Sequence, residues 1–263
     1  MREPAAEGRV SLAPVTGTTI QLCGRFVVLL DGRRVDGALP GRQGRLLFAY
    51  LALNRDRPVG RDELMEVVWP DELPRDPGDA FGALLSKVRS AVGAAWLEGR
   101  SELLLRLPAD VDIDVERALA AVHRAESACA REDWASAWSA SVAARAVAQR
   151  TLLGEHDAAW LDEWRRSLAD VLVRSLECYV RACLGLGGPE RAGAVRTARF
   201  LVATSPLRES GYDLLMAALE AQGNIAEAIE VYKEAARVLQ DELGVAPAPF
   251  LQARSARLVT RGA

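Results

Sequence analysis

The order of apolar and polar residues divides the chain into an N-terminal region of mixed pattern and a longer helical region. Apolar residues recur at every second position over residues 20–30, which is the period of a half-buried β-strand. The sequence Asp-Gly-Arg at 31–33 then favours a hairpin turn before Val35. We therefore predict a β-hairpin or small sheet at the start of the folded region.

Three helices and a second hairpin are predicted next. Apolar residues at helical spacing indicate a helix over 41–54 and another over 61–69, whose first turn carries carboxylates that suit the helix dipole. A third helix is expected to begin at a cap on Gly78 or Asp79. Its apolar stripe consists of Phe81, Leu84, Leu85, Val88 and Val92. Residues 98–107 complete a hairpin, and this order of elements is that of a winged-helix domain with an N-terminal sheet.

Beyond Asp112 the pattern is almost entirely helical. The pattern Ala-x-Ala-Val at 192–195 recurs 34 residues later as Ala-x-Ala-Ile at 226–229, which is the tetratricopeptide period. Ser205 and Pro206 are expected to be the cap and first residue of one helix. The predicted helices span 114–131, 134–150, 157–185, 189–204, 206–222, 225–242 and 248–260. The predicted fold class is mainly α: an α+β winged helix followed by an all-α, tetratricopeptide-like repeat domain.

Length and composition fit this division. The 263 residues are 50% hydrophobic with a net charge of −3, which is typical of globular proteins, and they suffice for two domains. We place a flexible tail at 1–18, the winged helix at 19–112 and the helical domain at 113–260. No stretch approaches the roughly 18 consecutive apolar residues of a membrane helix, so we expect a cytoplasmic protein without a membrane partner.

Sequence signals for catalysis or metal binding are missing. The four cysteines form no C-x-x-C pair, and the chain has only two histidines. No G-x-x-x-x-G-K-[ST] loop, G-x-S-x-G or H-E-x-x-H motif occurs. We therefore expect a protein that is not an enzyme and needs no metal or cofactor.

Several motifs resemble those of a known family. The helical region carries Ser-Pro-Leu-Arg-Glu at 205–209, Leu-Met-x-Ala-Leu at 215–219, Gly-Asn-x-Ala-Glu-Ala at 223–228, Tyr232, and Glu-Leu-Gly-Val-x-Pro at 242–247. The first region carries Gly-Arg-Gln-x-Arg-Leu-Leu at 41–47 and Trp-Pro at 69–70. Over about residues 19–255 the chain resembles the bacterial regulators typified by the Streptomyces antibiotic regulatory proteins. These pair an OmpR-type winged helix with a bacterial transcriptional activation domain.

The resemblance implies a sequence-specific DNA-binding transcriptional regulator, an activator. Promoter DNA would lie against the third helix in its major groove, and the helical domain would contact RNA polymerase or form a homodimer. The candidate DNA contacts are Ser86, Lys87 and Arg89 on the third helix, Arg100 and Arg106 on the wing, and Arg42 and Arg45 as clamps on the DNA backbone.

The net charge of the predicted winged helix supports an alternative in which this domain does not bind DNA. Residues 19–112 contain 13 Lys and Arg against 14 Asp and Glu, a net charge of −1, whereas DNA-binding domains usually present a basic surface. Gly82, Leu84 and Ser90 also stand where the family carries charged or polar residues. The alternative is a protein-interaction or ligand-sensing scaffold whose winged helix does not bind DNA. Phosphate contacts, however, need only a few well-placed cations.

Overall fold

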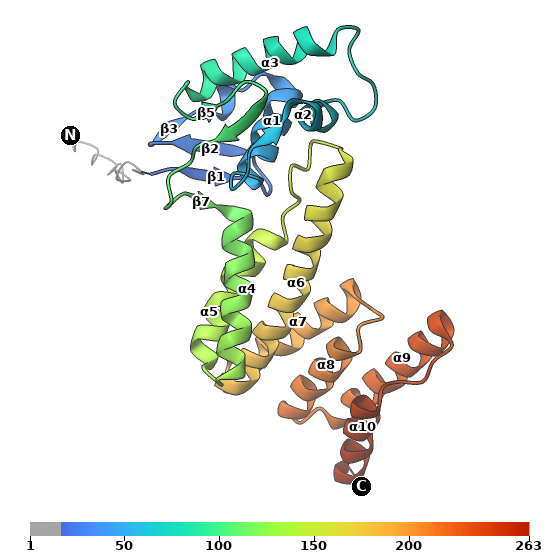
Figure 1. Ribbon diagram of the computed structural model, residues 1–263. Helices are drawn as coiled ribbons and strands as arrows, with labels where there is room; N and C mark the ends of the chain where they lie inside the picture. Colours follow the sequence, from blue (N-terminus) through green and yellow to red (C-terminus); the bar gives the residue numbers. More distant parts are fainter. Residues whose placement is uncertain (1–16, 263) are drawn as a thin grey trace, which may run out of the picture. The chain divides into compact units, whose positions relative to one another are not determined.

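The computed structural model describes residues 17–262 and divides between Ile113 and Asp114 into two compact units (Figure 1). We call the first the winged-helix unit and the second the helical unit. Residues 1–16 of the tail expected over 1–18 lie outside the described residues. The predicted fold class is confirmed: two small sheets and helices α1 to α3 come first, and the described residues after Ile113 form helices α4 to α10.

The winged-helix unit opens with a sheet of strand order β3-β2-β1-β7. Its strands are β1 (Thr19–Gln21), β2 (Val27–Leu30), β3 (Arg33–Arg34) and β7 (Asp112–Ile113). β1 pairs antiparallel with β2, with Ile20 opposite Val28, and parallel with β7. The predicted turn is confirmed, since Asp31 and Gly32 have φ angles of 50° and 75°, as a type I′ hairpin turn requires.

The alternating pattern over residues 20–30 does not form one continuous strand. The chain turns between β1 and β2, where Gly24 has a φ of 76°, a conformation that favours glycine. Leu22 and Cys23 enter the core inside this turn. Apolar residues therefore keep their two-residue spacing through the turn, and for this reason the sequence pattern does not show where β1 ends and β2 begins.

Helices α1 (Gly41–Leu53), α2 (Arg61–Val68) and α3 (Pro77–Val92) follow the first sheet, after a short 3-10 helix, η1 (Asp36–Ala38). Helix α1 packs against both α2 and α3. The wing is a second sheet of order β4-β6-β5, formed by β4 (Val59–Gly60), β5 (Leu97–Glu98) and β6 (Glu102–Leu105). The strand predicted to reach Leu107 thus ends at Leu105.

The start of α3 differs from the prediction. Asp76 caps the helix, and its carboxylate accepts a hydrogen bond of 3.2 Å from the backbone N–H of Asp79, so the predicted cap at Gly78 or Asp79 is wrong. Pro77 takes the first helical position, where a missing N–H leaves no acceptor unsatisfied. The predicted apolar stripe is buried as expected: Phe81, Leu84, Leu85, Val88 and Val92.

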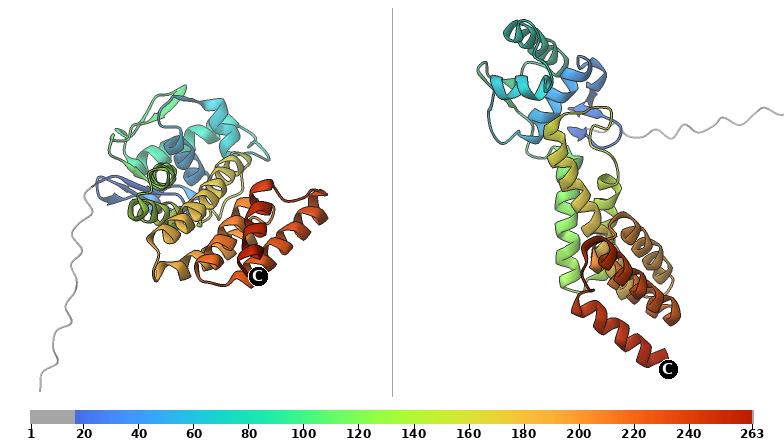
Figure 2. Two further views of the ribbon diagram at one scale, coloured as in Figure 1. Left: turned by 90° about the horizontal axis from the view of Figure 1, so that it is seen from below. Right: turned by 90° about the vertical axis from the view of Figure 1, so that its right-hand side faces the viewer.

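The helical unit is a succession of neighbouring helices. They are α4 (Asp114–Ala130), α5 (Trp134–Ala148), α6 (Ala159–Leu186), α7 (Glu190–Thr204), α8 (Glu209–Ala221), α9 (Ile225–Leu243) and α10 (Pro249–Gly262). Each helix packs against the next, as the further views show (Figure 2). Within residues 17–262 no helix combines the length and apolar character needed to cross a bilayer.

Helix α8 begins later than predicted, at Glu209 instead of Pro206. Its cap is Arg208, whose backbone is extended and whose N–H donates to the Ser205 carbonyl oxygen at 3.0 Å. Ser205 and Pro206 therefore form a turn before the helix, and the predicted cap at Ser205 is wrong. A proline suits the first position of a helix, but it equally suits the turn that precedes one.

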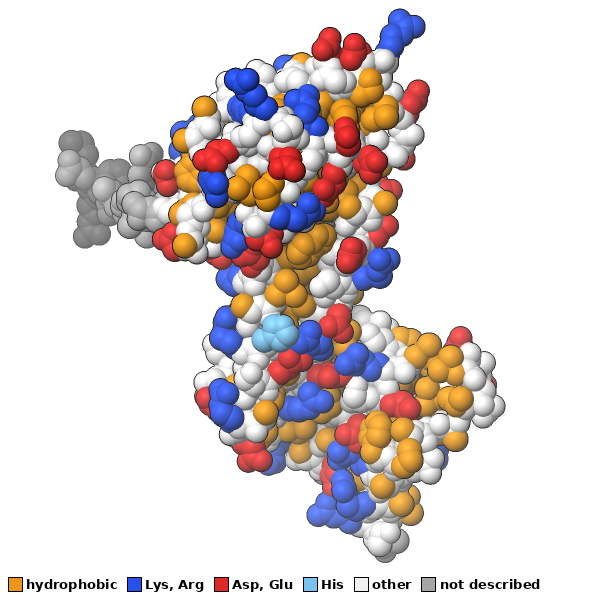
Figure 3. Space-filling model, viewed as in Figure 1, with side chains coloured by type: hydrophobic (Ala, Val, Ile, Leu, Met, Phe, Trp, Pro, Cys, Tyr) orange, Lys and Arg blue, Asp and Glu red, His pale blue; other side chains and the backbone are white. Residues whose placement is uncertain are grey.

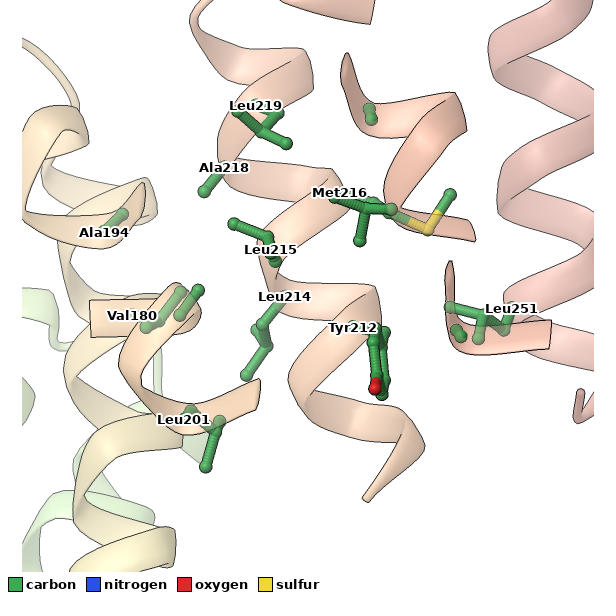
Figure 4. Close-up of a cluster of buried hydrophobic side chains, with 14 of the residues drawn as sticks. Val180, Ala194, Leu201, Tyr212, Leu214, Leu215, Met216, Ala218, Leu219 and Leu251 are labelled. Atoms are coloured by element: carbon green, nitrogen blue, oxygen red, sulfur yellow. The ribbon is translucent and has the colours of Figure 1, made fainter. Parts of the chain in front are cut away.

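The core of the helical unit gathers around α8 (Figure 4). Tyr212 is 1% exposed, and Leu201 and Met216 are fully buried in the same cluster. Gly211 permits α7 to approach, because a Cβ there would lie 3.3 Å from Leu201 Cγ. Tyr232, a residue of the family-like motifs, is only partly buried and packs on the edge of this cluster.

Candidate nucleic-acid interface

The exposed face of α3 offers few chemical groups. Ser86 and Lys87 are exposed, as expected from the burial of the apolar stripe on the opposite face. The Lys87 side chain forms no ion pair or hydrogen bond with the described part of the chain. Gly82 lies mid-helix, and a Cβ placed on it would meet no atom within 4 Å. This face of α3 therefore has room for a larger side chain at Gly82 and carries a single lysine, Lys87.

Arg89 is turned from this face toward the wing. Its Nη2 donates to the carbonyl oxygen of Gly99, and its Nε donates to that of Leu97 at 3.4 Å. The residue is partly buried. Arg89 therefore fastens the wing to α3, and the structure does not place it beside Lys87 as a second outward-facing cation.

The wing turn depends on Gly99. Its φ of 95° lies in the region that favours glycine, and a Cβ there would overlap the carbonyl oxygen of Glu102. The tight turn leaves Arg100 exposed, with no side-chain partner among residues 17–262. Arg106, by contrast, pairs with Glu98, the Nε to Oε2 distance being 2.9 Å. Of the two predicted wing cations, Arg100 is thus the one without a carboxylate partner.

Arg61, the first residue of α2, is a further contributor that the sequence pattern does not reveal. Its guanidinium lies over the Phe81 ring, 4.9 Å from the centroid. It also donates to the carbonyl oxygens of Gly78 at 3.4 Å and of Arg100 at 3.5 Å. One side chain thus joins the start of α2, the start of α3 and the wing.

Several cations around α3 and the wing are not bound by any carboxylate of residues 17–262. Arg61 and Arg89 donate to neutral carbonyl oxygens, which leave the positive charge of a guanidinium uncancelled. Lys87 and Arg100 meet no carboxylate within the described residues. We call Arg61, Lys87, Arg89 and Arg100 the α3–wing cations.

Much of the remaining charge in this unit is paired. Arg34 binds Asp36, and Arg57 binds Glu63. On the face shown in Figure 3, positive and negative side chains are interspersed over this unit. A net charge near zero therefore coexists with cations that no carboxylate of the described residues binds.

The two candidates on α1 differ in exposure. Arg42 is exposed in the first turn of the helix. Arg45 is partly buried, and its guanidinium lies 5.8 Å from the centroid of the Phe26 ring. Arg42 is thus the more accessible of the two for a phosphate.

Glu63 of α2 is bound both by α1 and by the loop that follows α1. Arg57 Nη1 lies 3.1 Å from Glu63 Oε2, and the Tyr50 hydroxyl donates to Glu63 Oε1 at 2.5 Å. The hydrogen bonds from Arg57 hold the pKa of Glu63 below its usual value. These contacts fix the helix that carries Arg61 at its first position.

Comparisons with known proteins agree with this architecture. The model of the family described as bacterial transcriptional activator domain matches residues 113–259. The regulatory protein AfsR of Streptomyces coelicolor is 31% identical over 245 residues, which cover 87% of this chain and 23% of AfsR. The transcriptional regulatory protein EmbR of Mycobacterium tuberculosis is 26% identical over 258 residues, which cover 90% of this chain and 62% of EmbR.

A solved structure has the same fold. It is that of M. tuberculosis EmbR in complex with a low affinity phosphopeptide, with a TM-score of 0.81 at 22% identity over 93% of this chain and 65% of that one. The chain spans less than two thirds of the length of AfsR or EmbR. The family match extends over more than half of the chain and confirms the resemblance seen in its motifs. The chain belongs to the bacterial transcriptional activator domain family.

Proposed function

We propose that this protein is a sequence-specific DNA-binding transcriptional regulator, an activator, that binds promoter DNA through its winged-helix unit. The observation that carries the proposal is the group of α3–wing cations, none of which forms an ion pair with a carboxylate of the described residues. Such a group attracts phosphates even in a domain of net charge −1. Relatives named as regulatory proteins support the same role.

The residues divide into contacting and positioning groups. Ser86 and Lys87 are exposed on α3 and would enter the major groove, while Arg100 at the wing turn would meet a phosphate. Arg61 and Arg89 hold the wing against α3 and add to the positive potential. Arg106 would have to leave Glu98 to reach DNA, so its share is smaller.

The helical unit would serve partner proteins. Contact with RNA polymerase, or formation of a homodimer, would convert DNA binding into a change of transcription. The succession of helices α4 to α10 supports this role, because stacked helical repeats present long surfaces for binding.

A salt titration tests DNA binding. Affinity for the DNA upstream of the protein's own gene is measured for wild type, Lys87→Ala and Arg100→Ala. Each lost phosphate contact should reduce the slope of log affinity against log salt by about one unit. Lys233→Ala is the matched control, since Lys233 is the only other lysine and lies exposed on α9 beside Glu230. If wild type shows no salt-sensitive binding, the proposal fails and the scaffold hypothesis replaces it.

A further inference from the structure

An open groove lies between α4 and α5 of the helical unit. Its volume is about 830 Å³. The residues that line it are His123, Arg124, Ser127, Ala128, Arg131, Ala135, Ser136, Ser139, Ala140 and Ala143. None of the described functional contacts of the winged-helix unit involves these residues, so the groove is a separate feature.

The lining of the groove is positively charged and rich in hydrogen-bond donors. It contains two arginines, a histidine and three serines but no Asp or Glu, in a chain with 36 acidic residues. The guanidinium groups of Arg124 and Arg131 form no ion pair or hydrogen bond with the described residues. Arg124 lies on α4 and Arg131 lies in the turn that follows this helix. The two cations therefore line the groove at different points along its length.

Of the neighbouring carboxylates, Glu126 is bound by Arg174, whereas Asp133 interacts electrostatically with Arg131. Glu126 receives two hydrogen bonds from Arg174, each of 2.7 Å, and His123 Nδ1 lies 3.6 Å from Glu126. The Asp133 carboxylate accepts from the backbone N–H of Ser136 at 3.2 Å and so caps α5. The charge of Arg124 is thus not offset by the acid that lies nearest to it in sequence, Glu126.

The floor of the groove is small and apolar. Four of its ten lining residues are alanines, and Ala128 is buried while Ala143 is exposed. Small side chains allow another helix to approach closely. A nucleic-acid backbone would gain little from methyl groups, whereas a helix can pack on them and present carboxylates to the rim.

From these features we infer that the α4–α5 groove binds an acidic α-helix of a partner protein. Carboxylates on one face of that helix meet Arg124 and Arg131, and small apolar residues between them lie on the alanine floor. The serine hydroxyls donate to carboxylates that the arginines do not reach. The inference rests on the partner-binding role proposed for the helical unit, but it does not depend on DNA binding by the winged-helix unit.

The test uses the full chain and a labelled, alanine-rich helical peptide of about 20 residues, long enough to be helical, with Glu at positions seven apart. A peptide with Lys in place of Glu is the control ligand. Fluorescence polarisation should show salt-sensitive binding of the Glu peptide and none of the Lys peptide. Arg124→Glu combined with Arg131→Glu should weaken binding at least about tenfold, through repulsion of like charges. Arg166→Glu, a reversal of an exposed arginine on α6 outside the groove, should leave binding unchanged.

A shape variant separates the groove from charge alone. Ala143→Trp fills the groove without altering its charge and should also abolish binding. Full binding by Ala143→Trp, or equal binding of the Glu and Lys peptides, would overturn the inference. Promoter DNA binding by the Arg124 and Arg131 variants is measured in parallel and should match wild type. If these variants lose DNA affinity but not peptide affinity, the groove binds nucleic acid and the inference is wrong.

Discussion

The arginines that attach the wing to α2 and α3, and those that join α6 to α4 and to the start of α8, are bound by different kinds of acceptor. In the winged-helix unit, Arg61 and Arg89 donate to backbone carbonyl oxygens, and so does Arg33, which binds the Val92 carbonyl oxygen at the end of α3 at 3.0 Å. In the helical unit, Arg174 binds Glu126 and Arg208 binds Glu177, each at 2.7 Å. A carbonyl group orients a guanidinium group but leaves its charge in place. A carboxylate orients the guanidinium group and also neutralises its charge.

This difference supports the proposed attraction of DNA to a unit of net charge −1. Arginines held by carbonyl groups stabilise the wing and still contribute a positive potential outside it. Arginines held by carboxylates stabilise helix packing and contribute little to the electrostatic potential around the protein.

The largest stability effect is expected for the carboxylate-bound class. Glu177 on α6 is 6% exposed and is bound by Arg208 and by the Ser210 hydroxyl, at 2.7 and 2.6 Å. Arg208→Ala leaves this carboxylate buried without its main partner and should lower the free energy of unfolding by about 1–3 kcal/mol. Denaturant unfolding followed by circular dichroism measures the loss. In a Glu177→Gln protein, Arg208→Ala should lower the free energy of unfolding by less. An equal loss with Glu177 and with Gln at this position would contradict the role of the Glu177 charge.

A smaller loss is expected for the carbonyl-bound class. Arg89→Ala frees the carbonyl groups of Leu97 and Gly99, which water can partly hydrate, so stability should fall by about 0.5–1.5 kcal/mol. DNA affinity should fall as well, because the wing loses its attachment to α3. Lys87→Ala is the matched control and should keep the wild-type thermal midpoint. Destabilisation by Lys87→Ala equal to that of Arg89→Ala would remove the distinction between contacting and positioning cations.

Substitution of Gly82 is expected to increase the stability of the protein. Because a Cβ there meets no atom within 4 Å, Gly82→Ala should stabilise the helix by about 0.5–1 kcal/mol. Gly82→Arg adds a cation to the exposed side of α3 and should steepen the salt dependence of DNA binding by about one unit. Thermal melts and the salt titration measure the two effects. An unchanged salt slope for the folded arginine variant would place this part of α3 outside the interface.

The smallest expected effect is a change in the pKa of the Cys129 thiol, which lies near the carboxylate-bound Arg181. Interaction with the Cys178 thiol, more than the charge of Arg181, lowers the pKa of Cys129 to about 7, and the Cys129 thiol donates to the Cys178 carbonyl oxygen at 3.8 Å. Arg181 itself lies 3.6 Å from the Glu177 carboxylate. Cys178→Ala should therefore raise the pH midpoint of Cys129 alkylation more than Arg181→Ala does. The reverse order, measured by iodoacetamide labelling across pH, would show that a carboxylate does not cancel the field of its arginine.

The sequence predicts the elements well where one face is buried. Helices α4 to α10 follow from apolar positions at helical spacing, and the exposure of Ser86 and Lys87 follows from the stripe that α3 buries. Starts of helices were less predictable. Asp76 competes with two later residues as a cap of α3, and Pro206 precedes α8 instead of opening it.

The wing attachment could not be predicted from local pattern. Arg61 binds carbonyl groups that lie 17 and 39 residues further along the chain, and backbone acceptors leave no trace in residue identity. Arg89 shares a helix with Lys87, but only the folded hairpin brings Gly99 within its reach. Acidic partners, in contrast, can at least be sought in the sequence.

The most direct test of the account uses the two lysines of the chain, Lys87 and Lys233. Acylation of each ε-amine is followed by mass spectrometry with and without saturating promoter DNA, so that Lys233 on α9 serves as an internal control. The account predicts that DNA slows modification of Lys87 several-fold and leaves Lys233 unchanged. Equal modification of Lys87 in the free and DNA-saturated protein would contradict the placement of α3 against DNA.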